Sequence, residues 1–192
     1  MNTMRAATAL LLVAFCTALS PHASLLHRCG SKTPPSAAEA TQALRAIVAA
    51  PRQDDWAPLF NTRWRPVFSL KPDAEEGRFL TVKAEQSFNR DGSFTNAIRL
   101  FGLKFVFAGT YALKGSATTL VIERLRVRRV LGVPLPSIDV REGRGIRGLI
   151  ERVRGRRKDG SKRPNVYSWC YADDEICVAR GSSGSTAVWV RA

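Results

Sequence analysis

The side chains that most often perform acid–base or metal chemistry are nearly absent from the body of this sequence. Its only two histidines are His22 and His27, both close to the N-terminus. Residues 39–192 therefore contain no imidazole to act as a general base, to pair with a nucleophile or to bind zinc. The sequence predicts a protein that is not a conventional enzyme and that uses no metal or other cofactor.

One acidic cluster stands out in a chain whose formal net charge is +14. Asp173, Asp174 and Glu175 are consecutive, and Arg180 follows shortly after them. A carboxylate of the cluster paired with Arg180 could order a hairpin or bind the polar head of a ligand. The alternative, which we favour, is a structural role in a solvated turn. An enzyme built on this chain would have to use Asp173, Glu175, Tyr171 or Arg180.

The four cysteines are Cys16, Cys29, Cys170 and Cys177, and no CxxC motif occurs. The spacing therefore supports neither a metal site nor a redox motif of the thioredoxin type. If residues 172–175 turn a hairpin, Cys170 and Cys177 would face each other, and a disulfide is then one interpretation. Two reduced, partly buried thiols are the interpretation we favour.

Two segments at the N-terminus have the composition of targeting sequences. Residues 1–19 hold a short apolar run followed by small residues, which is typical of a secretory signal peptide and too short for a transmembrane helix. Residues 20–38 contain no acidic residue and resemble a transit peptide. Together they predict delivery to a plastid, and the two-part form suggests a secondary plastid. Ordinary secretion is the alternative.

The first predicted element of the mature chain is a short amphipathic helix over residues 36–49. Ser36 and Glu39 have the spacing of a capping box, and Pro51 ends the helix. Its apolar face would pack against the rest of the domain.

Short strands joined by turns are predicted from residue 63 onward. Turns are expected at residues 90–93 and 114–116, and a stiff extended connection at residues 132–136. The expected strands cover residues 64–70, 78–89, 94–100, 103–113, 118–130, 166–171, 175–180 and 186–191. A mostly β fold follows, an antiparallel barrel or half-barrel of about eight strands, which can just enclose one small ligand.

A basic insertion over residues 141–163 interrupts the strands, with ten basic and three acidic residues. Its apolar residues have the spacing of a short amphipathic helix. Three interpretations are open: a helix at an anionic membrane surface, an RNA-binding arm, or a solvated loop. The membrane-surface candidates are Arg144, Ile146, Arg147, Leu149, Ile150, Val153, Arg154, Arg156 and Arg157.

Four stretches together resemble the plastid lipid-associated protein (fibrillin) family, over roughly residues 56–191. The most specific stretch runs from Tyr171 through the acidic cluster to Arg180-Gly181 and a final apolar strand. The others are residues 60–69, Gln86-Ser-Phe88 with Asn96-Ala-Ile98, and residues 122–125 with 132–136. Two positions depart from the family pattern, namely Ala172, where Leu is usual, and Cys177, where Arg is usual.

The resemblance implies a lipocalin-like barrel over residues 39–192 that binds or organises carotenoids, quinones, other prenyl lipids or acyl lipids. The expected partners are a hydrophobic lipid or pigment and an anionic membrane or plastoglobule surface, with nucleic acid disfavoured. Two other functions stay open: a lipid isomerase or cyclase on the same barrel, and a basic nucleic-acid-binding module.

Ligand pockets are mostly apolar with a few polar anchors, so aromatic residues of the predicted strands are the pocket candidates. They are Trp64, Phe68, Phe88, Phe105, Phe107, Tyr111, Trp169 and Tyr171. The polar anchors proposed from the sequence are Asn96, Asp173 and Arg180.

Overall fold

The computed structural model describes residues 21–51, 53, 55–100, 103–129, 134–139 and 165–192. Its helical elements are η1 (Arg28–Gly30), α2 (Ala37–Ala49) and η2 (Ala57–Leu59). Its strands are β1 (Thr62–Leu70), β2 (Arg78–Phe79), β3 (Lys83–Phe88), β4 (Ser93–Leu100), β5 (Leu103–Lys114), β6 (Ala117–Arg129), β7 (Pro134–Asp139), β8 (Asn165–Ala172), β9 (Ile176–Gly181) and β10 (Thr186–Arg191).

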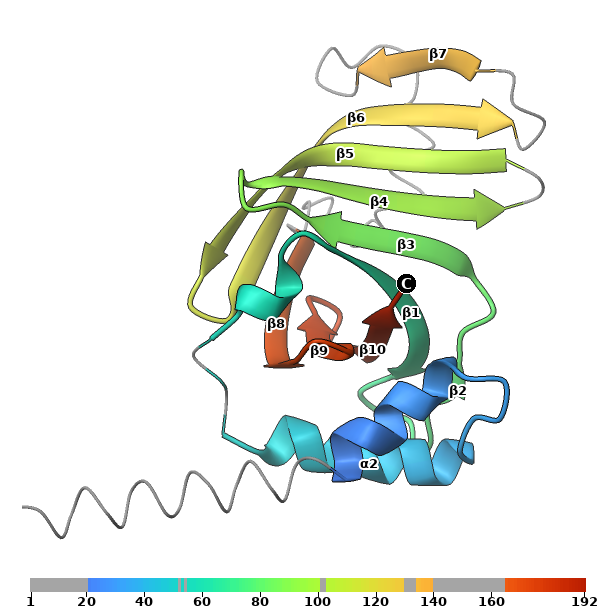
Figure 1. Cartoon of the computed structure of the whole chain (residues 1–192), viewed down its shortest axis with the longest axis vertical. Helices are drawn as coiled ribbons and strands as arrows, with labels where there is room; N and C mark the ends of the chain where they lie inside the picture. The colour runs from blue at the N-terminus through green and yellow to red at the C-terminus, as the bar shows by residue number, and fades with distance from the viewer. Residues whose placement is uncertain (1–20, 52, 54, 101–102, 130–133, 140–164) are drawn as a thin grey trace, which may run out of the picture.

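Eight of these strands form a closed antiparallel barrel (Figure 1). The order around the ring is β1, β3, β4, β5, β6, β8, β9 and β10, and β10 pairs back with β1. The predicted antiparallel barrel is therefore confirmed, in its closed form. β2 and β7 lie outside the ring, paired with β1 and β6. Residues 134–136 of the predicted stiff connection thus belong to a paired strand.

The tight turns of the barrel come from local sequence. Gly92, between β3 and β4, has φ of 81°, and Gly115, between β5 and β6, has φ of 58°, a region that favours glycine. The Asp91 carboxylate accepts a hydrogen bond of 2.8 Å from the amide of Ser93. Both turns fall where the sequence predicted them. The strand predicted over residues 78–89 is divided, however, because β2 and β3 pair with different parts of β1.

The two faces of the sheet carry two separate apolar clusters. The inner cluster faces the barrel interior and draws on most strands of the ring. Its buried residues are Trp56, Leu59, Trp64, Phe88, Phe94, Leu120, Trp169, Ala172, Cys177, Ala179 and Trp189. The outer cluster lies on the opposite face of β1, β8, β9 and β10. Its buried residues are Ala23, Leu26, Cys29, Ala40, Ala43, Leu44, Ile47, Val67, Phe68, Cys170, Ile176, Val178, Val188 and Val190.

Helix α2 covers the outer face of the barrel (Figure 1). The hydroxyl of Ser36 accepts a hydrogen bond of 3.2 Å from the Glu39 amide, and the Ser36 amide donates to the Glu39 carboxylate at 2.8 Å. The predicted capping box and helix are thus confirmed. Leu44 and Ile47 are buried on the side of α2 that meets the outer cluster.

Residues 21–30 complete this cover, with residues 21–27 helical and continuous with η1. Leu26 is fully buried, and Ala23 and Cys29 are buried beside it in the outer cluster. The Arg65 guanidinium donates a hydrogen bond of 3.1 Å to the carbonyl of Gly30. The segment that the sequence predicted as transit-like therefore supplies buried side chains to the fold.

The cysteines of the described residues are buried and form no disulfide with one another. Cys170 belongs to the outer cluster and Cys177 to the inner cluster, so their side chains lie on opposite faces of the sheet. The disulfide that the sequence left open is therefore absent, and the reduced pair is the state observed. Cys16 lies outside the described residues.

We expect Cys29 and Cys177 to resist iodoacetamide in the folded protein at about pH 8 and to react quickly once it unfolds. Burial raises the pKa of Cys29 from 9.0 to about 11 and holds the pKa of Cys177 well above 9.0. Because the folded state favours the protonated thiols, these thiols contribute to the free energy of unfolding below the pKa that they have in the unfolded chain. That contribution is lost as the pH rises through their raised pKa in the folded protein. Peptide mass spectrometry with and without urea measures the labelling, and rapid labelling of either native thiol would contradict the prediction.

Candidate functional site in the barrel interior

Strand register assigns the inward-facing residues of β3, β4 and β5. Ala84, Gln86 and Phe88 of β3 alternate with more exposed neighbours and are paired with Ile98, Asn96 and Phe94 of β4. The same β4 residues pair with Phe105, Phe107 and Gly109 of β5. Side chains opposite each other in a ladder lie on the same face of the sheet. Three successive layers of side chains therefore line this wall of the interior.

One end of the interior is filled by aromatic rings. Trp169 lies at its centre, with ring centroids 5.6 Å from Phe88 and 6.0 Å from both Tyr167 and Trp189. Phe88 also meets Tyr111 edge-on at 5.2 Å. Trp169 and Phe88 are each at most 2% exposed. This end is a packed floor rather than a binding space.

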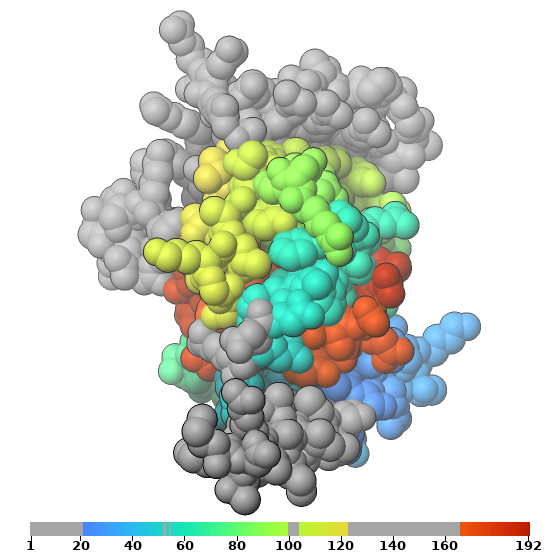
Figure 2. Space-filling model, turned by 60° about the vertical axis from the view of Figure 1, so that its left-hand side comes forward, coloured from blue at the N-terminus to red at the C-terminus, as the bar shows by residue number. Residues whose placement is uncertain are grey.

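The same end is covered by the segment that contains η2. Trp56 and Leu59 are buried in the inner cluster, and the Trp64 indole donates a hydrogen bond of 3.1 Å to the Leu59 carbonyl. Figure 2 shows this segment, in turquoise, lying between the yellow-green β5–β6 region and the orange β8 region. The packed floor is thus closed from outside by protein.

Two donors of the floor have partners within the protein. The Trp169 indole donates a hydrogen bond of 2.8 Å to the hydroxyl of Thr118. The Tyr111 hydroxyl donates to the Asn89 carbonyl at 2.7 Å, and burial raises the pKa of this hydroxyl. These groups fix the rings in place, as expected of a structural floor.

Above the floor, the inward-facing residues are less completely buried. Ile98, Asn96, Phe105 and Phe107 all keep part of their exposure, although they face into the barrel. Their side chains are apolar except for Asn96. This half of the interior is the candidate binding site, because its apolar, inward-facing side chains are only partly buried.

A polar group marks the boundary between the two halves. Gln86 is 5% exposed and pairs with Trp64 on one side and Asn96 on the other. The Tyr167 hydroxyl lies beside this amide but not in hydrogen-bond geometry with Nε2; burial raises the pKa of the hydroxyl, and the nearby amide lowers it in part. Among the described residues, nothing accepts a hydrogen bond from Gln86 Nε2.

The structure distributes the predicted pocket residues over both faces of the sheet. The inward-facing ones are Trp64, Phe88, Phe105, Phe107, Tyr111 and Trp169. Phe68 and Tyr171 instead pack with the outer cluster. Sequence reasoning missed Gln86, Tyr167 and Trp189, although each lies two positions from a residue that it named or in a predicted strand.

The polar anchors proposed from the sequence lie in three different places in the structure. Asn96 faces the interior. Asp173 shapes the β8–β9 turn, accepting hydrogen bonds from the amides of Glu175 (2.8 Å) and Ile176 (2.7 Å) and from the Tyr171 hydroxyl (2.9 Å). Arg180 is exposed, and no ion pair joins it to Asp173 in the described part of the chain. The Asp173 carboxylate therefore holds this turn together.

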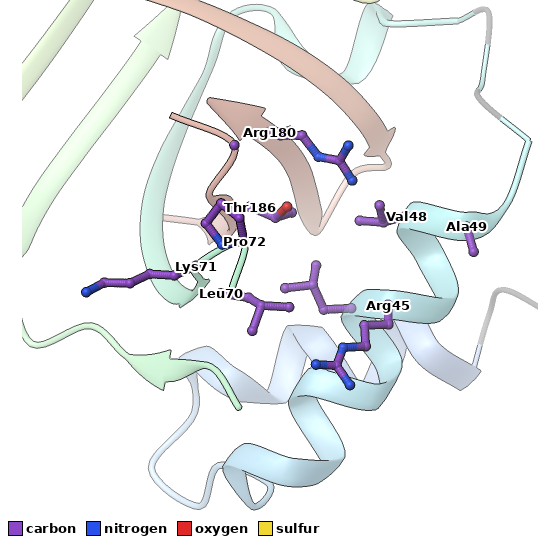
Figure 3. Close-up of a pocket in the computed structure, with 10 residues that line it drawn as sticks. Arg45, Val48, Ala49, Leu70, Lys71, Pro72, Arg180 and Thr186 are labelled. Carbon is purple, nitrogen blue, oxygen red and sulfur yellow. The ribbon is translucent and has the colours of Figure 1, made fainter. Parts of the chain in front are cut away.

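A second concave surface lies outside the barrel, between α2 and the ends of β1, β9 and β10. It is a groove of about 590 Å³ whose lining includes Leu70, Arg45, Lys71 and Arg180. In Figure 3, Lys71 points away from the groove, and Arg45 lies across it from Arg180. The Arg45 guanidinium donates a hydrogen bond of 2.8 Å to the Glu75 carbonyl. Arg45 thus joins α2 to the segment after β1.

The predicted membrane-surface residues in the basic insertion, from Arg144 to Arg157, lie outside the described residues. Among the residues that are described, no helix is both long and apolar enough to cross a membrane. Nor does that part of the chain gather three or more His, Cys, Asp or Glu side chains that could hold a metal ion.

Comparison with known proteins finds similarity at the level of solved structures. A lipocalin-like protein from Bacteroides uniformis aligns with 14% identity over 71% of this chain and 100% of its own, with a TM-score of 0.48. An uncharacterised protein from Bacteroides eggerthii aligns with 14% identity over 72% of this chain and 100% of its own, with a TM-score of 0.44. No family model and no curated protein match the chain. Membership of the plastid lipid-associated family therefore stays a prediction.

Proposed function

We propose that the barrel binds one hydrophobic small molecule in its interior without converting it chemically. The observation that carries the proposal is the incompletely buried apolar wall formed by Ile98, Phe105 and Phe107. Because the aromatic floor below this wall is packed and capped, a ligand would rest on Phe88 and Trp64 and leave the other half of the barrel unchanged.

The ligand class that best fits the sequence is a carotenoid, quinone, prenyl lipid or acyl lipid at a plastid membrane or plastoglobule. The N-terminal segments and the family resemblance support this context. The absence of histidine from residues 39–192 supports a non-catalytic role. Mass spectrometry of lipids extracted from the natively purified protein tests the ligand class.

Binding itself is tested with diphenylhexatriene, a neutral hydrocarbon whose fluorescence rises in an apolar site. All four tryptophans belong to the inner cluster, so energy transfer from tryptophan to the probe reports binding to the barrel. We expect saturable binding of about one probe per chain, since a barrel of this size encloses one small ligand.

The substitution Phe107→Asp places a charge on the apolar wall and should weaken probe binding by about tenfold or more. Val106→Asp is the matched control, because the adjacent residue of β5 faces the other side of the sheet. Circular dichroism shows whether both variants fold. Absence of saturable binding to the wild-type protein, or equal loss in the two folded variants, would reject the proposal.

A further inference from the structure

Gln86 is the feature of the interior that the fold itself does not explain. Its side chain is 95% buried, as its 5% exposure shows, and it lies on the inward face of β3. Its Nε2 has no hydrogen-bond acceptor among the described residues. Buried donors are almost always paired, because burial removes the water that would otherwise accept from them. An unpaired buried amide therefore needs a reason.

The neighbouring polar groups show that this interior normally satisfies its donors. The indole nitrogens of Trp64 and Trp169 donate to Leu59 and Thr118, and the Tyr111 hydroxyl donates to Asn89. Those donors belong to the packed floor. Gln86 differs because it lies at the boundary between the floor and the half of the barrel whose inward-facing side chains are only partly buried.

The side chains around Gln86 on this wall carry no charge. On the described strands β3, β4 and β5, the inward-facing neighbours of Gln86 are Ala84, Phe88, Asn96, Ile98, Phe105 and Phe107, which are all uncharged. An anionic head group would meet no counter-ion on these three strands, and burying an unpaired charge against apolar side chains is strongly unfavourable. A neutral acceptor would gain a hydrogen bond without that penalty.

We infer that Gln86 Nε2 donates a hydrogen bond to a carbonyl oxygen of the ligand, so that the site takes a neutral hydrophobe carrying a ketone, quinone or ester. The inference rests on the proposed binding function. The aromatic floor limits how deeply the ligand can enter. Gln86, with Asn96 and Tyr167 beside it, selects ligands whose carbonyl oxygen lies within hydrogen-bond distance of Nε2.

The test compares two probes of one shape, a prenylated naphthoquinone and the corresponding prenylated naphthalene, by isothermal titration calorimetry. The wild-type protein should bind the quinone about tenfold more tightly, the scale expected when a buried donor gains its partner. In Gln86→Leu the quinone should lose this advantage, while the naphthalene keeps its affinity within about threefold. Gln86→Met is a second variant of nearly the same length, in case leucine disturbs the packing.

Four results would overturn the inference, and they distinguish its failure from failure of the proposed binding function. Equal wild-type affinities for the two probes, or a quinone preference that survives in both Gln86 variants, would reject the role of Gln86 and leave hydrophobe binding standing. Binding of neither probe, nor of diphenylhexatriene, would reject both proposals. Tighter binding of a fatty-acid anion than of the quinone would reject the neutral class.

Discussion

A chain that begins at Ser36 should lose about 4 kcal/mol or more of unfolding free energy relative to a chain that begins at Pro21. The shortened chain keeps α2 and its capping box but lacks Leu26, which is fully buried, and Cys29, which is 7% exposed. Removing one buried leucine side chain typically costs about 2–5 kcal/mol, and here the neighbouring side chains are lost with it. Urea denaturation of the two chains measures the difference.

Point substitutions separate packing from chain length in this comparison. Leu26→Ala should reproduce about 2–5 kcal/mol of the loss, whereas Ser24→Ala, at an exposed position of the same helical segment, should change stability by less than about 0.5 kcal/mol. Equal stability of the two chains would contradict the prediction. A measured loss would also mean that removal of residues 20–38 in the cell leaves a barrel with part of its outer cover missing.

Replacing Trp169 by alanine should lower the free energy of unfolding by about 3–5 kcal/mol. Trp169 is 2% exposed and contacts Phe88, Tyr167 and Trp189. The substitution leaves a cavity in the centre of the floor and removes the donor to the Thr118 hydroxyl, which is itself buried. The unfolding free energy from a urea titration followed by circular dichroism measures the effect.

Trp169→Phe serves as the companion variant because it keeps a ring at the centre of the floor but loses the indole donor. It should cost less than the alanine variant, with about 1–3 kcal/mol coming from the unpaired hydroxyl and the smaller ring. Val121→Ala is the surface control, since Val121 is 50% exposed. A loss below about 1 kcal/mol in Trp169→Ala would show that the floor is not packed as described.

The features that the sequence predicted well are local ones. The capping box of α2 depends on Ser36 and Glu39 alone, and the turn at Gly92 depends on residues within the turn. The antiparallel barrel was also predictable, because several short strands with short turns leave few other arrangements. Its closure required the pairing of β1 with β10, which no local pattern shows.

The inward and outward assignments failed where a β-bulge interrupts the alternation. Trp64 and Phe68 share a face in a regular strand, but a register shift between Pro66 and Phe68 turns Phe68 to the outer cluster. A second shift, between Trp169 and Tyr171, does the same for Tyr171. One extra residue reverses the face of every side chain after it, and hydrophobic patterns do not locate that residue.

The importance of Gln86 could not be read from the sequence for a different reason. Its inward direction follows from its position two residues before Phe88 in β3. Its unpaired amide, however, depends on which groups from β1, β4 and β8 surround it in the closed ring. Such a contrast between satisfied and unsatisfied donors exists only in three dimensions.

Closure of the ring depends on the pairing of β1 with β10, two strands that lie far apart in the sequence. β1 and β10 join Trp64 to Arg191, and the amide of the last residue, Ala192, donates to the Arg63 carbonyl at 2.8 Å. Contacts between such distant parts of a chain form slowly, after local hairpins. Until β10 arrives, β1 and β9 remain open edges. A chain in which β10 is missing or unpaired therefore cannot close this barrel.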